Sequence, residues 1–199
     1  KNFVAYMNLA YIAGMHGDHN KSIEYYNNAL EIDPENVKAL NLIGVQYDLI
    51  GDYNSGLESF EKAYDLEPTN QSVLLNMAYC LSALDRKGEA IELLQNAPLG
   101  MSKTKLAEYL FEKGELDEAE NELNKLLAYH PDASSSIDLW GILITIYSKQ
   151  DNTDEMQNCL QRIIQIEPET LQDVYKKAMW CKYKDADMAI DLCQQYLSA

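Results

Sequence analysis

The feature of this sequence that most limits its possible folds is an internal repeat with a period of 34 residues. Residues of the same or similar type recur at this spacing in six pairs: Gly17 and Gly51, Tyr26 and Phe60, Ala29 and Ala63, Pro34 and Pro68, Ala10 and Gly44, and Gly44 and Ala78. Six pairs at one spacing do not arise by chance, so the chain repeats one structural unit. Units of this length form no single central core, because each must bury its apolar face against the next unit.

Each unit is predicted to contain two amphipathic helices. Apolar and small residues follow steps of three and four, as in Leu40, Ile43, Gly44 and Tyr47 and again in Leu57, Phe60, Ala63 and Tyr64. Such spacing places them on one face of a helix. The segment 51–53 interrupts the pattern, and Pro34 and Pro68 end the second helices because proline cannot continue a helix. The order helix, turn, helix, proline therefore recurs along the chain.

Composition excludes several classes of partner. Apolar residues make up 47% of the chain and aromatic residues 10%, which is enough for a folded core. With 32 acidic against 16 basic residues the net charge is -16, so nucleic acid and acidic membrane surfaces are repelled. No apolar run approaches the roughly 18 residues of a membrane span, and we expect no membrane insertion.

The cysteines and the absent motifs limit the chemistry further. Four cysteines occur without a C-x-x-C pair or a neighbouring histidine, which predicts reduced, buried thiols, no zinc site and a cytoplasmic protein. The nucleophile, phosphate-loop, dinucleotide and zinc-hydrolase motifs are absent, so we expect neither an enzyme nor a cofactor. His16 and His19 flank a predicted turn, where polar residues are ordinary, and no metal site is predicted there.

In order and spacing, the second unit resembles the tetratricopeptide repeat (TPR) family. It carries the family pattern through Leu40, Ile43, Gly44, Tyr47, Gly51, Gly56, Phe60, Ala63 and Pro68, with Gly56 in place of the usual alanine. The resemblance covers essentially the whole chain. It implies an all-α fold, a right-handed TPR superhelix (α-solenoid) of about twelve antiparallel helices.

The resemblance implies one array over residues 1–199. Its six repeats are expected at about 3–36, 37–70, 71–99, 100–133, 137–169 and 170–199. The third repeat is short, because residues 96–100 truncate its second helix, and we expect the stack to bend there. Residues 132–136 lengthen the connection between the fourth and fifth repeats. The sixth repeat has lost its proline and turn glycine, as terminal repeats often do.

In the TPR family, the first helices of the repeats line a concave groove that holds peptides or extended segments of partner proteins. The resemblance therefore implies a protein–protein interaction scaffold or adaptor. Twelve groove-facing residues are predicted to bind the peptide: Met7, Asn8, Tyr11, Met15, Asn41, Leu42, Val45, Leu49, Leu75, Asn76, Tyr79 and Lys105. Methionine and aromatic side chains in a solvated groove favour an apolar ligand, although the superhelix could instead close over this stripe itself.

Two polar binding modes can be compared with the sequence. The amides of Asn8 and Asn76 offer a donor and an acceptor to a peptide backbone, and their positions are similar to an asparagine ladder known in TPR superhelices. The carboxylate clamp of other TPR proteins is present only in part. Asn41, Asn76 and Lys105 fit it. Two further positions, where the clamp needs a cation or an amide, are occupied here by the apolar residues Val45 and Met101.

Two other functions stay open from the sequence. The chain could be a structural or self-associating TPR arm, or the substrate-recognition region of a larger multidomain protein. Repeat arrays usually carry polar caps, whereas helix-like sequence here begins at Phe3 and continues to Leu197. We therefore also expect that uncapped ends can form a homo-oligomer.

Overall fold

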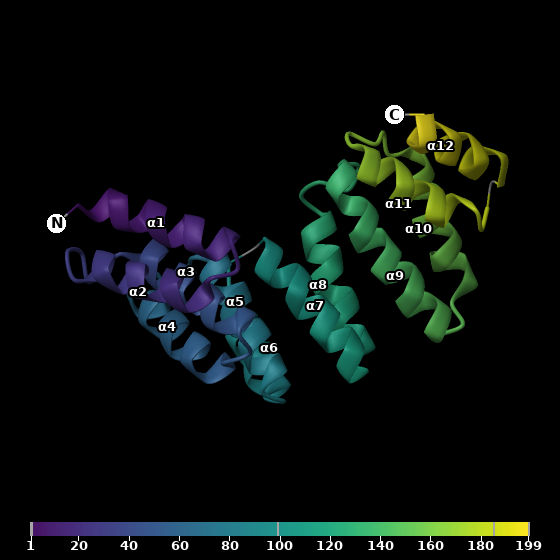
Figure 1. Ribbon diagram of the computed structural model, residues 1–199. Coiled ribbons are helices and arrows are strands. Elements are labelled where there is room, and N and C mark those ends of the chain that lie inside the picture. The colour runs from purple at the N-terminus through teal and green to yellow at the C-terminus, as the bar shows by residue number, and fades with distance from the viewer. Residues whose placement is uncertain (1, 99, 185, 199) are drawn as a thin grey trace. The chain divides into compact units, whose positions relative to one another are not determined.

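The computed structural model describes residues 2–98, 100–184 and 186–198, and all regular structure within them is helical (Figure 1). This confirms the all-α fold of about twelve helices. Within the described residues the twelve α-helices are α1 (Phe3–Met15), α2 (His19–Leu30), α3 (Val37–Leu49), α4 (Tyr53–Leu66), α5 (Gln71–Ala83), α6 (Lys87–Gln95), α7 (Met101–Lys113), α8 (Leu116–Leu127), α9 (Ile137–Lys149), α10 (Thr153–Gln165), α11 (Leu171–Cys181) and α12 (Ala186–Ser198).

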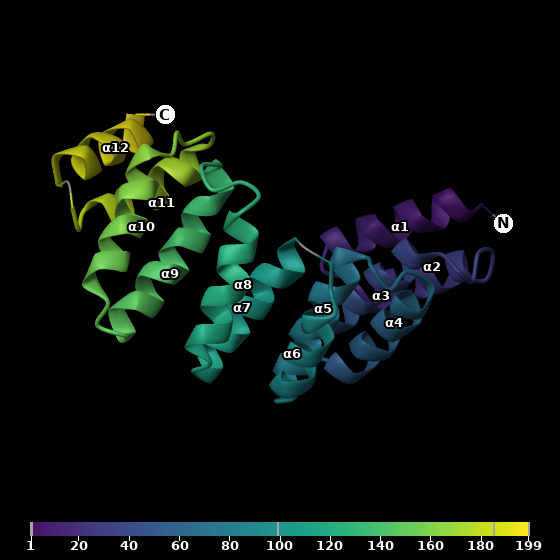
Figure 2. The same ribbon diagram turned by 180° about the vertical axis from the view of Figure 1, so that it is seen from behind.

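The helix pairs α1–α2, α3–α4, α5–α6, α9–α10 and α11–α12 pack antiparallel, and α2, α4 and α10 each also contact the helix that follows (Figure 2). The chain divides into two compact units, unit 1 (Lys1–Leu106) and unit 2 (Ala107–Ala199), and the division falls inside α7. The single array and the bend at residues 96–100 stay predictions, and the expected repeat ends at residues 99 and 199 lie outside the described residues. The short second helix of the third repeat is confirmed by α6.

The repeat determines where the first helices of unit 1 begin. Asn2, Asn36 and Asn70 follow one another at the repeat spacing and are the N-caps of α1, α3 and α5. Each side-chain oxygen accepts a hydrogen bond from a backbone N–H of the first helical turn, as between Asn36 Oδ1 and the N–H of Ala39 at 3.0 Å. These bonds satisfy donors that have no partner inside a helix. The same side-chain chemistry thus starts α1, α3 and α5.

Small residues lie where paired helices approach closely, as the repeat predicts. Ala10, Ala29, Ala63 and Ala78 are fully buried. A Cβ atom at Gly44 would come within 2.4 Å of Cε1 of the Phe60 ring. The spacing between α3 and α4 therefore depends on the absence of a side chain at this position.

The connection between α8 and α9 is more ordered than the sequence suggested. Its three serines form a 3-10 helix, Ser134–Ser136, and Ser134 and Ser136 are buried. The indole Nε1–H of Trp140 donates a hydrogen bond to the carbonyl of Pro131 at 2.9 Å and attaches α9 to this connection. The lengthened segment is a folded part of unit 2.

Cys80, Cys159 and Cys181 are buried free thiols, whereas Cys193 on α12 is exposed, so the expectation of buried thiols is wrong for this residue. In the described part of the chain, no three potential ligand side chains gather into a metal-binding group. Within the same residues, no helix is both long enough and apolar enough to cross a membrane.

Candidate functional site

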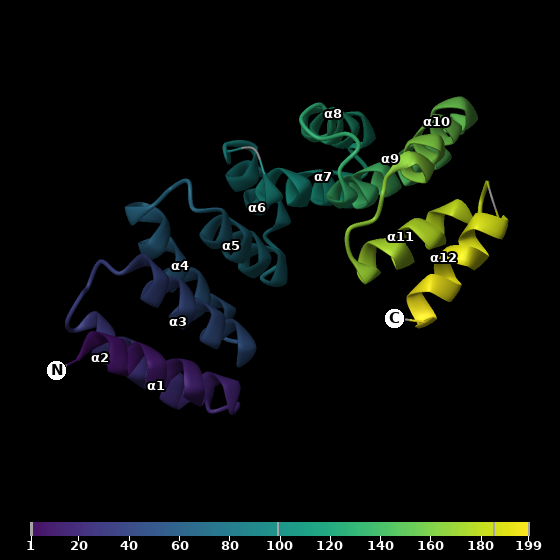
Figure 3. The ribbon, with the colours of Figure 1, turned by 90° about the horizontal axis from the view of Figure 1, so that it is seen from above.

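All twelve predicted binding residues lie on first helices, and all of them belong to unit 1. Four come from each of α1 and α3, three from α5, and Lys105 lies in α7. In this unit α3 lies between α1 and α5 (Figure 3). Equivalent residues of neighbouring first helices can therefore form one surface.

Some of the predicted residues support the core. Met7 and Leu42 are partly buried and pack against the cluster of Ala10, Ile23, Tyr26 and Ile43. Leu75, the equivalent of Met7 on α5, is also partly buried. Lys105 is half-buried and already interacts with other groups of the protein. These side chains pack against the protein itself and leave little of their surface for a ligand.

The remaining apolar residues form what we call the exposed stripe: Tyr11, Met15, Val45, Leu49 and Tyr79. They lie in the C-terminal halves of α1, α3 and α5. Tyr11 is 60% exposed, Met15 71%, Leu49 60% and Tyr79 52%, with Val45 partly buried among the equivalent positions. Neighbouring helices pack about 8–10 Å apart, so these large side chains lie close enough to contact one ligand.

An aromatic residue that the sequence reasoning missed supports this stripe. Tyr53, the first residue of α4, meets Tyr79 edge to face, with ring centroids 6.1 Å apart and planes at 71°. Its hydrogen bond with Tyr79 is the main cause that raises the pKa of the Tyr53 hydroxyl. Such T-shaped pairs are favourable, and this pair holds the Tyr79 ring in place. The only signal in the sequence is that Tyr53 is an aromatic residue that closely follows the turn glycine Gly51.

The predicted asparagines are arranged differently from a simple ladder. Asn76 Nδ2 donates a hydrogen bond to Asn41 Oδ1 at 3.0 Å and links α5 to α3. Asn8 is exposed, and its side chain has no hydrogen-bond partner within the described residues. An asparagine pair of this kind still presents unused donor and acceptor atoms to a peptide backbone. The grip of Asn8 and Asn76 on a ligand stays a prediction.

A half-buried carboxyl group on α3 also lies near this surface. The thiol of Cys80 donates to Asp48 Oδ1 at 2.8 Å. Burial raises the pKa of Asp48, and the thiol hydrogen bond offsets part of that rise. A Cβ at position 56 would come within 2.5 Å of the same oxygen, which explains why Gly56 replaces the alanine of the repeat pattern.

We expect Asp48→Asn to stabilise the protein at neutral pH and to change nothing at low pH. Because the pKa of Asp48 is raised in the folded state, its contribution to stability is present below its unfolded value of 3.8 and is lost as pH rises through the folded value. The neutral amide keeps an oxygen for the thiol and avoids this loss. Urea unfolding between pH 3 and pH 7 measures the difference in unfolding free energy between the variant and the parent.

Asp52→Asn is the matched control for this measurement. Hydrogen bonds from Ser55 lower the pKa of Asp52, so its contribution is present at neutral pH and is lost as pH falls. The change in unfolding free energy caused by Asp52→Asn must therefore vary with pH in the opposite direction to that caused by Asp48→Asn. The same direction for both variants would contradict a raised pKa at Asp48.

Comparison with known proteins places these repeats in context. Three family models, each described as a tetratricopeptide repeat, match residues 3–36, 51–103 and 104–133. None of the three describes a catalytic domain. No curated protein matches this sequence.

Several solved structures share the fold. The MamA protein is 24% identical with a TM-score of 0.65, and the match covers 92% of this chain and 96% of that one. YrrB, a TPR protein with an unusual peptide-binding site, is 21% identical with a TM-score of 0.60 over 88% of this chain and 92% of its own. PilW, a type IV pilus biogenesis factor, is 17% identical with a TM-score of 0.63 over 98% and 92%. At these identities, the similarity shows that the chains share the solenoid fold and nothing more.

Proposed function

Because the chain belongs to the tetratricopeptide repeat family, we propose that it is a protein-interaction scaffold that binds an extended segment of a partner protein on the first-helix face of unit 1. The observation that carries the proposal is the exposed stripe of Tyr11, Met15, Val45, Leu49 and Tyr79. We propose the cytoplasm as its compartment, where unpaired thiols stay reduced.

The chemistry of the stripe favours an apolar ligand. Tyrosine and methionine side chains left in water gain free energy when a partner covers them, by about 1.5–3 kcal/mol for a large side chain that becomes fully buried. Tyrosine is also enriched among the residues that dominate binding energies, because it combines a rigid apolar ring with a polar hydroxyl. A ligand with apolar or aromatic side chains matches this surface best.

Beside the stripe, the Asn41–Asn76 pair supplies polar groups for the ligand backbone. An extended peptide alternates its side chains and exposes backbone N–H and C=O groups between them. Apolar side chains on the stripe and backbone groups on the amides therefore fit one extended segment. YrrB shares the fold and has a peptide-binding site, which supports the proposal.

The test is to find where peptides bind. Peptides selected from a random display library against the purified chain are titrated into isotope-labelled protein, and backbone amide shifts are followed by NMR. We expect the changes to cluster on α1, α3 and α5 around the stripe, and the selected peptides to be rich in aromatic and aliphatic residues. Changes confined to second helices would contradict the proposal.

The same titration separates the alternative expected from the sequence. A structural or self-associating arm predicts that no selected peptide shifts the stripe residues. It also predicts that the mass measured by analytical ultracentrifugation rises with protein concentration. A substrate-recognition region of a larger protein would still bind peptides on the stripe, so its peptide-binding surface would be the one proposed here.

A further inference from the structure

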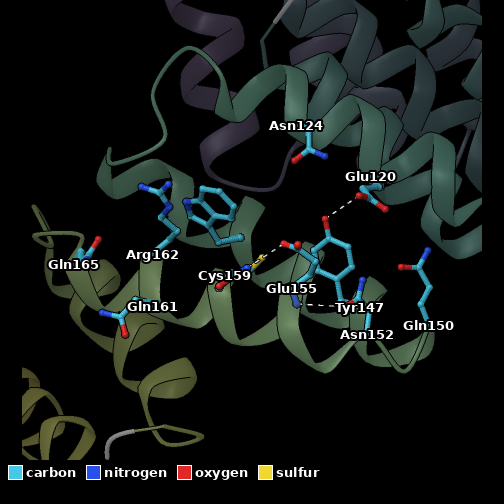
Figure 4. A pocket seen from close by; sticks show the side chains of 12 residues that line it. Glu120, Asn124, Tyr147, Gln150, Asn152, Glu155, Cys159, Gln161, Arg162 and Gln165 are labelled. Atoms are coloured by element: carbon cyan, nitrogen blue, oxygen red, sulfur yellow. Dashed lines mark hydrogen bonds between the residues drawn. The ribbon is translucent and has the colours of Figure 1, made fainter.

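A cleft of about 890 Å³ lies in unit 2 between α8, α9 and α10, on the side of the second helices. Tyr147 and Cys159 are buried at its floor, Glu120 and Asn124 line it from α8, and Glu155 and Arg162 line it from α10 (Figure 4). Its volume is typical of ligand sites in proteins.

The equivalent place in unit 1 holds a much smaller hollow. The gap between α2 and α4, over α3, has a volume of about 160 Å³. There Ser55, Ser59 and Lys62 take the places that Glu155, Cys159 and Arg162 hold one hundred residues later. The connection at 128–136 is longer than the one at 31–36 and contains a 3-10 helix. The wider cleft thus accompanies the folded insertion between the fourth and fifth repeats.

The floor of the cleft is fixed by hydrogen bonding. The hydroxyl of Tyr147 donates to Glu120 Oε1 at 2.8 Å and joins α9 to α8. Burial first, and then this hydrogen bond, raise the pKa of Tyr147, so the phenol stays protonated as a donor. Burial raises the pKa of the Cys159 thiol to about 12, which makes it an inert part of the floor.

The walls offer unused polar groups. Within the described residues, the side chains of Asn124, Gln161 and Gln165 have no hydrogen-bond partner, although all three line the cleft. Each amide carries both a donor and an acceptor, so amides from two facing helices can pair with the backbone of a chain lying between them. Figure 4 shows Asn124 across the cleft from the α10 residues.

The charges in the cleft are separated along its length. Glu120 lies near one end and Arg162 near the other (Figure 4), and Glu155 precedes Arg162 by two turns of α10, about 10 Å. In a chain of net charge -16, Arg162 has no ion pair or hydrogen bond within the described residues. The other arginine of the chain, Arg86, is paired with Glu89 at 2.7 Å. The guanidinium of Arg162 is therefore available for an anionic group of a ligand.

We propose that this cleft binds an extended peptide segment that carries a basic side chain and, three residues along, an acidic side chain. Three residues of extended chain span about 10 Å, which matches the separation of Glu155 and Arg162 along α10. The basic group faces Glu155 and Glu120, the acidic group faces Arg162, and the wall amides bind the backbone. A neutral carbohydrate would use neither charge. This inference is independent of the first-helix stripe, because it lies on other helices of the other unit.

The test uses three capped peptides built of Gly and Ser. The first carries Lys and Asp three residues apart, the second carries them adjacent, and the third carries Gln and Asn in their places. Binding is followed by the indole N–H signal of Trp140, which lines the cleft, with Trp180 as the internal reference. We expect the first peptide to shift Trp140 and to bind at least about threefold more tightly than the other two.

Two variants pair protein charges with peptide charges. Glu155→Gln and Arg162→Gln should each weaken the first peptide by about 3- to 10-fold. Replacing the peptide Lys should cost nothing further in Glu155→Gln, and replacing the peptide Asp should cost nothing further in Arg162→Gln. Asp154→Asn, on the same helical turn, and Lys62→Gln, at the position equivalent to Arg162, are matched controls that should leave the affinity unchanged.

Three outcomes would overturn the proposal. The first is a Trp140 signal that no peptide shifts, and the second is equal affinity for charged and neutral peptides. The third is a shift of Trp140 by a neutral disaccharide such as maltose that is unchanged by Glu155→Gln, which would identify a carbohydrate site instead. The four substituted side chains, Lys62, Asp154, Glu155 and Arg162, are exposed on helix surfaces. Far-UV circular dichroism should therefore show unchanged helicity in every variant.

Discussion

Gly44→Val should lower the free energy of unfolding by about 2–3 kcal/mol, the cost of overfilling a packed core. Even the Cβ atom of the new side chain would come within 2.4 Å of the Phe60 ring. Phe60 is fully buried between its neighbours, so the ring has no free space into which it can rotate. Relief requires α3 and α4 to move apart. Urea denaturation followed by circular dichroism measures the loss.

A size exchange tests this cause. Phe60→Leu alone should destabilise the protein, because it leaves a cavity, but it should cost less in the presence of Gly44→Val. We expect a favourable coupling of at least about 1 kcal/mol between the two substitutions. Gly88→Val is the matched control, because nothing lies within 4 Å of a Cβ at this helical glycine. A loss at Gly88 as large as that at Gly44, or strict additivity at Gly44 and Phe60, would contradict the packing explanation.

Local structure was predictable because it depends on residues that are close in the sequence. The repeat spacing located the two helices of each unit, and Ala10, Ala29 and Ala63, which belong to the repeating pairs, are fully buried. Capping follows from side chains within one helical turn, as at Asn152, the N-cap of α10, whose side chain accepts a hydrogen bond from the N–H of Glu155. These features need no knowledge of how one repeat is rotated against the next.

Contacts between repeats were less predictable. The Asn76–Asn41 hydrogen bond and the Cys80–Asp48 hydrogen bond join residues 35 and 32 positions apart, so neither follows the repeat spacing of 34. Such offsets depend on the rotation of one helix against its neighbour, which ridge-and-groove packing sets only within about 15–20°. A rotation of this size also decides which predicted groove residues become core.

The same reasoning explains why the cleft in unit 2 was not predicted. The sequence indicated a longer connection between the fourth and fifth repeats, but not the 3-10 helix of residues 134–136 or the anchoring of Trp140 to Pro131. These features accompany a larger cleft between α8, α9 and α10 than the one at the equivalent place between α2, α3 and α4. A polar side chain on a second helix is normally a solvated residue, and only the width of this gap makes Arg162 part of a site.

The double variant Tyr11→Ala, Tyr79→Ala should weaken binding of the selected peptides by about 30- to 150-fold. Buried aromatic residues at the centre of an interface commonly contribute more than 1 kcal/mol each, and a combined loss of about 2–3 kcal/mol corresponds to this factor. Both rings are more than half exposed in the free protein, so the folded state loses little when they are removed. Fluorescence anisotropy with labelled peptides measures the affinity, and thermal unfolding measures the stability.

Tyr129→Ala is the matched control for this loss, because Tyr129 is a tyrosine of similar exposure, 66%, that lies outside the stripe. It removes the same chemical group from the surface without changing α1, α3 or α5. Equal losses of affinity in the control and the double variant would mean that the peptides adhere to exposed tyrosine in general. An unchanged affinity in the double variant would mean that the stripe is not the binding surface. A loss confined to the double variant requires that the ligand covers at least one of these two rings, and the single variants Tyr11→Ala and Tyr79→Ala then show whether the first and third repeats both contribute.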